Sequence, residues 1–394
     1  MESSASHGIR AIERKFEAIF GAKPAVVVRA PGRVNLIGEH TDYNDGFVLP
    51  VAIDRGILMA AAPRDDGRVV LHALDFGQSV EFSLEAIERD EEKPWSNYQR
   101  GVAYFLQERG FKLVGLNACI SGDVPIGSGL SSSAAVEVAA AYTWQVLSGF
   151  ELSRVELALL CQRAENEFVG MSCGIMDQFV SALGHRGHAL FLDCRSLDYE
   201  LIPLPSGAKI VIADTGVRRD LVSSEYNTRR RECEEGVRLL QQYLPHVRAL
   251  RDVSIAQFET YQGELPNTVR RRCRHVVSEN ERVLSSVEAL RRGDLAAFGR
   301  LMNESHRSLR DDYEVSCSEL DDMVEAARKV KGVYGSRMTG AGFGGCTVSL
   351  VAEEAVEEFR RRVATEYEAA TGLVPRIYVC SAEDGVEAVK GLAT

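Results

Sequence analysis

No stretch of this sequence approaches the roughly eighteen uninterrupted apolar residues that a membrane-spanning helix needs. Residues 1–7 contain no apolar core, so they do not resemble a signal peptide. Basic residues are outnumbered as well, because 46 lysines and arginines stand against 57 acidic residues, giving a formal net charge of −11. That sign argues against a general nucleic-acid binder or a binder of anionic membranes. We therefore expect a soluble, cytoplasmic protein without nucleic-acid or membrane partners.

The nine cysteines show neither a CxxC pair nor the spacing of metal ligands. An odd number without such a framework indicates reduced thiols rather than a disulfide scaffold. The composition is globular, with 45% hydrophobic and 26% charged residues, and 394 residues are too many for one ordinary core. Two domains are therefore expected. Pro203, Pro205 and Gly207 place their boundary between residues 205 and 206, giving domains 1–205 and 206–394.

Hydrophobic periodicity predicts alternating helices and strands. Helical spacing is clearest over residues 9–20, 97–108, 153–169 and 276–290. Strands are predicted at residues 25–28, 56–62, 69–73, 113–120, 209–213, 346–351 and 376–380. Residues 29–43 mix glycines with charged and hydroxyl side chains and follow neither period. We predict a loop there, and such loops are where ligand contacts concentrate.

The strongest local signal lies in residues 125–135, where a glycine-rich turn leads into three serines and a helical run of small residues. Gly127 and Gly129 can take positive φ and direct backbone N–H groups at one concavity. The helix that follows would place its positive N-terminal end at the same point, which suits phosphate oxygens. Taken alone, the stretch could equally be an ordinary turn with Ser131 as a helix N-cap.

Two familiar nucleotide motifs do not fit. No Gly-Lys-Ser/Thr follows the glycine-rich turn, and Ser132 stands where a GxGxxG pattern needs its third glycine. Asp75-Phe76-Gly77 spells the metal-binding triplet of protein kinases, but neither an HRD loop nor a VAIK lysine accompanies it. We interpret that triplet as a turn between two strands.

Three segments together point to a family. Residues 29–43, 125–135 and 340–345 occur in the order of the three signature segments of the GHMP small-molecule kinases, and residues 32–44, GRVNLIGEHTDYN, resemble the galactokinase signature. The resemblance includes Ser224-Glu225-Tyr226 and residues 306–313, HRSLRDDY, and covers essentially the whole chain. It implies an α+β GHMP kinase fold, with a ribosomal-S5-like α/β N-terminal domain, a ferredoxin-like C-terminal domain and the active site in the cleft between them.

The resemblance also implies a reaction and its residues. ATP would phosphorylate the anomeric C1 hydroxyl of α-D-galactose to galactose 1-phosphate and ADP, the first committed step of galactose catabolism. Family similarity assigns ATP to Gly127, Ser128, Gly129, Leu130, Ser131, Ser132 and Ser133. It assigns Mg²⁺ to Ser133 and Glu165, whose oxygens suit a hard cation. It assigns galactose to Glu39, His40, Asp42, Gly174, Asp177 and Tyr226. Asp177 and Arg33 match the family's catalytic pair.

Proton energetics limit what an aspartate can do in this reaction. Aspartate has a pKa of about 3.9 and an alcohol one near the ~15.7 of water, so full deprotonation before transfer would cost about 16 kcal/mol. A loose phosphoryl-transfer transition state needs little activation of the nucleophile. We therefore expect Asp177 to orient the hydroxyl and to accept its proton late. Arg33 and Mg²⁺ would stabilise charge on the transferring phosphoryl group.

Two alternatives remain open. A galactose- and ATP-binding regulatory sensor without catalysis is expected to have a damaged glycine-serine loop, whereas residues 129–135 are intact here. An N-acetylgalactosamine kinase is expected to depart from the pattern of residues 39–44, and this sequence keeps it. The sequence identifies no protein partner, and we expect a monomer or a weak dimer.

Overall fold

The computed structural model describes residues 4–125, 127–218 and 222–390. Ile126, directly before the expected phosphate loop at residues 127–133, lies outside these ranges. The described strands form three sheets. The first sheet consists, in spatial order, of β13 (Glu387–Lys390), β1 (Val26–Asn35), β3 (Pro50–Arg64), β6 (Gly115–Gly122), β4 (Arg68–Ala73) and β5 (Gln78–Ser83).

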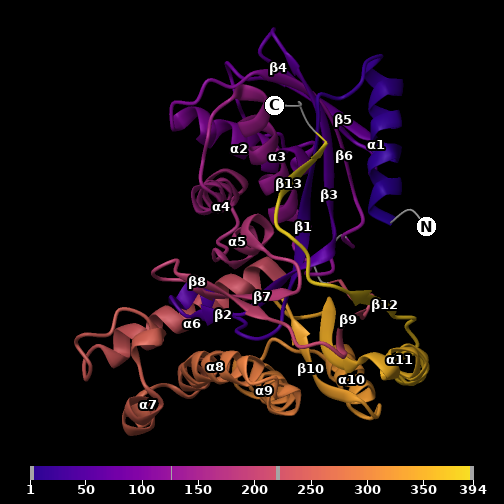
Figure 1. The fold of residues 1–394 in the computed structure, drawn as a ribbon. Coiled ribbons are helices and arrows are strands. Elements are labelled where there is room, and N and C mark those ends of the chain that lie inside the picture. The colour runs from indigo at the N-terminus through magenta and orange to yellow at the C-terminus, as the bar shows by residue number, and fades with distance from the viewer. Residues whose placement is uncertain (1–3, 126, 219–221, 391–394) are drawn as a thin grey trace.

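Helices cover both faces of the first sheet (Figure 1). On one face, Phe16 of α1 (Ser4–Phe20) packs against Val27 and Ala60. On the other face, Val26 and Val28 join a core that includes the fully buried Trp144. That core is covered by α2 (Asn97–Glu108), α3 (Ser132–Ser148), α4 (Arg154–Arg163) and α5 (Met176–Leu183). Successive side chains of a strand point to opposite faces, so β1 is apolar on both.

The predicted loop at residues 29–43 is wrong for residues 29–35, which continue β1. Strand β1 lies between β13 and β3, and all of its residues except Arg29 are buried. A strand buried on both faces shows no alternation of apolar and polar residues, so the periodicity test fails there. Pro31 is accommodated because the register with β3 shifts between Pro31 and Arg33. As a consequence, Arg33 projects from a rigid strand rather than from a loop.

Strand β13 was not expected from the sequence. It is four residues long and pairs antiparallel with β1, so its yellow ribbon lies beside the indigo start of the chain in Figure 1. The predicted domain boundary at residues 205/206 stays a prediction. Strand β9 (Ala208–Asp214), the first strand after that boundary, belongs to the second sheet, whereas β13 belongs to the first.

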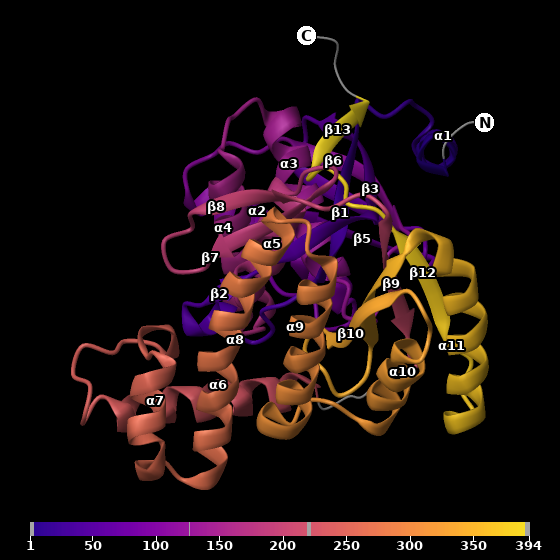
Figure 2. The same ribbon diagram turned by 60° about the horizontal axis from the view of Figure 1, so that its bottom comes forward.

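The second sheet has the order β10 (Val333–Thr339), β11 (Cys346–Ala352), β9, β12 (Arg376–Cys380). Phe359 lies in the apolar cluster between one face of this sheet and the helices α10 (Ser318–Arg328) and α11 (Val356–Thr371). The other face meets α8 (Asn267–Arg291) and α9 (Leu295–Ser308), which run side by side in Figure 2. That core also contains Val34 and Val51 of the first sheet, so one apolar cluster joins both halves of the chain.

Helix α8 supports the segment between β1 and β2 (Phe47–Val48). The Gly38 N–H donates to Oε1 of Glu279 at 3.0 Å, and the Phe47 N–H donates to Oδ1 of Asn280 at 2.9 Å. Burial alone would raise the pKa of Glu279, but the charges of Arg282 and other nearby basic side chains lower it to about 2. A fully buried, ionised carboxylate therefore holds the backbone of this segment.

The remaining strands and two further helices lie around these two sheets. The third sheet has the order β2, β7 (His188–Asp193), β8 (Tyr199–Pro203). Helices α6 (Val222–Leu240) and α7 (Ile255–Tyr261) pack against α8. None of the helices described is both long enough and apolar enough to cross a membrane.

Candidate active site

A cavity of about 520 Å³ gathers residues that are far apart in the sequence. Among the residues expected to form the site, its lining contains Arg33, Glu39, His40, Asp42, Gly127, Gly129, Leu130, Ser131, Ser132, Ser133, Glu165, Gly174, Asp177 and Tyr226. Ser128 does not belong to the lining, because it is fully buried and its hydroxyl donates to the Pro125 carbonyl at 2.6 Å.

The glycine-serine loop has the backbone of an anion-binding turn. Gly127, Gly129 and Ser131 have φ of 68°, 79° and 60°, and α3 begins at Ser132. Alternate residues with positive φ turn backbone N–H groups toward one side, where the positive end of α3 lies. Ser131 occupies the N-cap position, but its side chain makes no capping hydrogen bond. Its hydroxyl donates to Asp177 instead, so the reading of this serine as an ordinary cap is wrong.

Arg33 and Asp177 form a fork at the base of this loop. Nε and Nη2 of Arg33 donate to Oδ1 and Oδ2 of Asp177 at 2.7 and 2.6 Å, and Nη1 donates to the Gly129 carbonyl at 2.6 Å. Burial alone would lower the pKa of Arg33, but the charges of Asp177 and Glu39 raise it. The Asp177 side chain stays 26% exposed. A bidentate, charge-assisted pair fixes the plane of the carboxylate while leaving it accessible.

Asp42 lies close to these charges. Burial, and then the charge of Asp177, raise the pKa of Asp42 to about 7. Gly174 packs so tightly against Asp42 that a Cβ on residue 174 would lie 1.9 Å from the Asp42 Oδ2 atom. Glycine is therefore required at position 174 for Asp42 to keep its place. Asp42 is half-protonated near neutral pH, so it can either donate or accept a hydrogen bond there.

Glu39 is held by the turn between β10 and β11. Its Oε1 accepts from the Gly340 N–H at 2.8 Å, from the Thr339 hydroxyl at 3.0 Å and from Nη1 of Arg337 at 3.4 Å. Arg337 is fully buried. The sequence signal for this support is weak, because Arg337 lies in a mixed segment, VYGSRMT, three residues before Gly340. Arg337 is not among the residues expected to form the site.

Aromatic side chains surround His40. The His40 ring lies 5.6 Å from that of Tyr226 and 4.7 Å from that of Tyr313 (centroid to centroid), and Nδ1 lies 2.8 Å from the Tyr43 hydroxyl. Burial lowers the pKa of His40 well below its ordinary value, so the ring is neutral. His40 itself has φ of 63°, a conformation that is uncommon for residues other than glycine.

Glu165 lies on a π-helical turn, η3 (Ala164–Val169), which continues α4. Such turns are rare and frequent at functional sites. Nε2 of Gln178 donates to Oε2 of Glu165 at 2.5 Å and to Oε2 of Glu137 at 3.1 Å. The Ser133 hydroxyl also hydrogen-bonds to Glu165, whose pKa is raised by burial and by the charge of Asp177. Glu137 is fully buried, and the small-residue pattern of α3 gave no sign that it would approach the site.

These residues suit a magnesium ion that is only partly held by protein. Within the described ranges there is no group of three or more His, Cys, Asp or Glu side chains that could hold a metal. Mg²⁺ in phosphoryl-transfer enzymes keeps several waters and substrate oxygens and needs one or two protein ligands. The hydroxyl of Ser133 and the carboxylate of Glu165, which are within hydrogen-bond reach of one another, fit that requirement.

The other end of the cavity is apolar. Phe76, Trp95, Tyr98 and Ile120 line it, and the rings of Phe76 and Trp95 are 6.4 Å apart. Asp75–Gly77 lies in a turn between β4 and β5, as predicted. Its Asp75 carboxylate accepts from the Ser121 hydroxyl and the Gly122 N–H, at 2.9 and 2.8 Å. Reading the triplet only as a turn missed that Phe76 contributes to the site.

Comparison with known proteins shows which family the chain belongs to. The family described as "Galactokinase galactose-binding signature" matches residues 14–63. "GHMP kinases N terminal domain" matches residues 97–185, and "GHMP kinases C terminal" matches residues 286–369. A galactokinase of Roseiflexus sp. (strain RS-1) is 54% identical over 375 residues, which cover 95% of this chain and 96% of that protein. The chain belongs to the galactokinase family.

Two further galactokinases are similar to nearly the whole chain. A galactokinase of Chloroflexus aggregans (strain MD-66 / DSM 9485) is 52% identical over 374 residues, covering 95% of this chain and 96% of the relative. The crystal structure of Lactococcus lactis galactokinase complexed with galactose superposes with a TM-score of 0.94 at 38% identity, covering 97% of this chain and all of that one. A mevalonate kinase, 20% identical with a TM-score of 0.64, shares the fold. The expected GHMP kinase fold is confirmed.

The charges around Asp42 lead to a testable prediction. In the ligand-free protein, the Asp42 carboxyl should titrate near pH 7, because burial and the charge of Asp177 both favour its neutral form. The Asp177→Asn substitution removes one of those charges and should lower the pKa of Asp42. Carboxyl ¹³C NMR measures this titration, with the Asp42 signal assigned by its loss in Asp42→Asn.

A matched control is Asp123→Asn, which changes an exposed carboxylate near the glycine-serine loop. It should leave the titration of Asp42 unchanged. An Asp42 pKa near 4 in the wild-type protein, or equal pKa values in wild type and Asp177→Asn, would contradict the prediction.

Proposed function

We propose that this galactokinase-family protein transfers the γ-phosphoryl group of ATP to the C1 hydroxyl of galactose, and that the cavity described above is where transfer occurs. The Arg33–Asp177 fork is the observation that carries the proposal. It contacts the glycine-serine loop through Gly129 and Ser131, and the charges of Glu39 and Asp42 from the galactokinase signature segment act on Arg33. The fork therefore lies between an anion-binding loop and the side chains of Glu39 and Asp42, which can form hydrogen bonds with sugar hydroxyls.

The nucleotide would occupy the loop and the apolar end. Backbone N–H groups of residues 127–133, together with the N-terminus of α3, offer donors to phosphate oxygens. Phe76, Trp95 and Tyr98 offer aromatic surface to a purine ring. Ser128 would support the loop through its bond to Pro125 rather than contact phosphate with its side chain.

Ser133 and Glu165 would hold Mg²⁺. When bound, the ion neutralises negative charge on the transferring phosphoryl group and on the leaving diphosphate. Gln178 donates to Glu165 and so fixes the direction of the carboxylate. Burial and the charge of Glu165 raise the pKa of Glu137, whereas burial and the charge of Asp177 raise the pKa of Glu165. A nearby cation would favour the ionised form of Glu165.

The sugar would bind where polar groups face the cavity near Asp177. Glu39, His40, Asp42 and Tyr226 line this end, and Gly174 leaves room beside Asp42. Side chains fixed in this way discriminate strongly against a sugar that leaves one of them without a hydrogen bond. Support for galactose as the acceptor comes from the match of residues 14–63 to the galactose-binding signature.

Asp177 would orient the C1 hydroxyl and accept its proton as the bond to phosphorus forms. Its carboxylate already accepts two hydrogen bonds from Arg33 and one from Ser131, so its direction is fixed before the sugar binds. Late proton transfer is compatible with a loose transition state. Arg33 would stabilise negative charge on the phosphoryl oxygens from within hydrogen-bond reach of the loop.

Sugar-dependent ADP formation tests the function directly. Galactose should support ADP release with the highest kcat/KM among galactose, glucose, and the 2-acetamido derivative of each. ³¹P NMR of the product should show a phosphate on the anomeric carbon. A preference for N-acetylgalactosamine would identify the protein as an N-acetylgalactosamine kinase instead. Binding of galactose without any ADP release would identify it as a regulatory sensor.

Substitution of the proposed base gives a second test. Asp177→Asn keeps the shape and polarity but removes the proton acceptor, so kcat should fall about 100-fold or more. Asp123→Asn, which alters an exposed carboxylate before the loop, should leave kcat within about twofold. Steady-state kinetics with saturating ATP and galactose measure both. Turnover near the wild-type rate in Asp177→Asn would remove Asp177 from the chemistry.

Magnesium dependence gives a third test. Glu165→Gln should raise the Mg²⁺ concentration for half-maximal activity at least about tenfold, because it replaces an anionic ligand by a neutral one. Glu167→Gln, on the same π-helical turn but exposed and paired with Arg163, is the matched control and should leave that concentration unchanged. Equal Mg²⁺ requirements of Glu165→Gln and the wild type would exclude Glu165 as a ligand.

A further inference from the structure

Tyr313 ends the segment HRSLRDDY and has been described so far only as a neighbour of the His40 ring. The Tyr313 side chain is fully buried. Its ring centroid lies 4.7 Å from that of His40 and 4.6 Å from that of His275, and His275 in turn lies 3.1 Å, through Nε2, from the Glu39 carbonyl oxygen. Tyr313 therefore packs directly behind the segment that is proposed to contact the sugar.

Two arginines fix the backbone on which Tyr313 lies. Tyr313 ends the π-helical turn η6 (Leu309–Tyr313), and Glu314 follows with φ of 55°. The carbonyls at such an end have no partner within the helix. Arg229 donates to the carbonyls of Tyr313 and Glu314 at 2.7 and 2.9 Å, and Arg272 donates to that of Asp312 at 2.6 Å.

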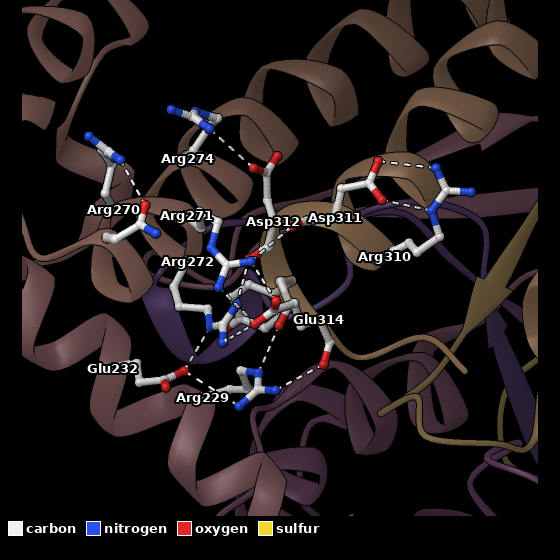
Figure 3. Close-up of polar contacts among 12 residues, drawn as sticks. Arg229, Glu232, Arg270, Arg271, Arg272, Arg274, Arg310, Asp311, Asp312 and Glu314 are labelled. Atoms are coloured by element: carbon white, nitrogen blue, oxygen red, sulfur yellow. Dashed lines mark hydrogen bonds and ion pairs between the residues drawn. The ribbon is translucent and has the colours of Figure 1, made fainter. Parts of the chain in front are cut away.

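These arginines form the centre of a larger polar network, shown in Figure 3. Arg272 also donates to the carboxylates of Glu232 and Glu314, at 2.8 and 2.7 Å, so its charge is compensated although the side chain is almost fully buried. Arg229 comes from α6, three residues after Tyr226. The hydrogen bonds from Arg229 to the carbonyls of Tyr313 and Glu314 thus fix η6 relative to α6, the helix that carries Tyr226.

A chain of hydroxyl groups connects Tyr313 with His40. The Tyr313 hydroxyl lies 3.2 Å from the Cys233 sulfur and 2.7 Å from the Tyr43 hydroxyl. The Tyr43 hydroxyl lies 2.8 Å from Nδ1 of His40. Each link is a hydrogen bond that could run in either direction. If Tyr43 donates its one proton to His40, the bond between the two tyrosines must be donated by Tyr313.

The link to imidazole sets that direction. A phenol is a stronger donor than a neutral imidazole N–H, and an unprotonated imidazole nitrogen is a stronger acceptor than a phenol oxygen. Tyr43 therefore donates to Nδ1 of His40, and Tyr313 donates to Tyr43. The ring is neutral, so its single proton is on Nε2. Within the described residues Nε2 is buried and makes no hydrogen bond of good geometry. Besides Tyr43, the Ala341 backbone acts on the ring as a hydrogen-bonding group, and both His40 and Ala341 line the cavity.

We propose that Tyr313 and Tyr43 form a hydroxyl relay that holds His40 in the tautomer with its proton on Nε2, so that His40 presents a hydrogen-bond donor to the sugar. Tyr313 and Tyr43 are positioning residues: they act on the sugar only through the orientation and tautomer of His40. The role of the relay rests on the proposed function, because it assigns His40 to the sugar. The tautomer itself is a property of the ligand-free protein.

Tyrosine-to-phenylalanine substitutions test the relay. Tyr43→Phe and Tyr313→Phe should each raise the KM for galactose about 3- to 10-fold, the effect of one hydrogen bond, while kcat and the KM for ATP stay within about twofold. ¹⁵N NMR of labelled histidine should show Nδ1 unprotonated and Nε2 protonated for His40 in the wild type. Both substitutions should change that pattern toward a mixture of tautomers.

Tyr367→Phe is the matched control. It also removes one buried tyrosine hydroxyl, which donates to the Thr215 carbonyl at 2.9 Å, away from His40. It should change neither the KM for galactose nor the His40 signals. Should Tyr313→Phe fail to fold, Tyr43→Phe breaks the next link, at a side chain that is only partly buried.

The outcomes separate the relay from the proposed function. No galactose-dependent ADP release by the wild type would reject the proposed function, and an unchanged KM for galactose in His40→Gln would reject the assignment of His40 to the sugar. A proton on Nδ1 in the wild type, or unchanged His40 signals in both phenylalanine variants, would overturn the relay. So would a normal KM for galactose in both variants when His40→Gln raises it.

Discussion

The ion pair of Arg33 and Asp177 is the contact on which the candidate site depends. Arg33 lies on a strand buried on both faces, and Asp177 lies in the first turn of α5. Their fork joins the first sheet to the helix layer and also takes in the Gly129 carbonyl and the Ser131 hydroxyl. A buried ion pair contributes little net stability, because desolvation offsets its Coulomb energy. Its value here is geometric, since it fixes the direction of a carboxylate.

The charge balance around this pair explains the unusual state of Asp42. Three carboxyl groups, on Glu39, Asp42 and Asp177, influence the Arg33 guanidinium. Glu39 finds compensation in the Arg337 side chain and in the N–H of Gly340, and Asp177 finds it in Arg33. Arg33, already paired with Asp177, lowers the pKa of Asp42 only in part, because burial and the charge of Asp177 raise it to about 7.

The sequence alone predicts those parts of the site that depend on a short run of neighbouring residues. The turn around Gly127 and Gly129 could be recognised as a possible anion site because glycines there lead directly into a helix of small residues, although an ordinary turn has the same local pattern. Asp177 and Glu165 could be named only through family resemblance, since a single carboxylate carries no pattern of its own. Residues 29–35 were misassigned because strand burial on both faces erases periodicity. The supporting residues Arg337 and Tyr313 come close to the signature segment only through tertiary packing, which no local window contains.

Strand β13 gives the fold an order of assembly. Strand β1, which carries Arg33, has β3 on one side and residues 387–390 on the other. During synthesis β3 (Pro50–Arg64) follows β1 closely, whereas the second neighbour, β13 (Glu387–Lys390), is made only after every other strand described. Until then, part of β1 has an open edge, with backbone groups free to pair with another strand. Completion of the sheet that carries Arg33 thus depends on residues that are made long after β1 itself.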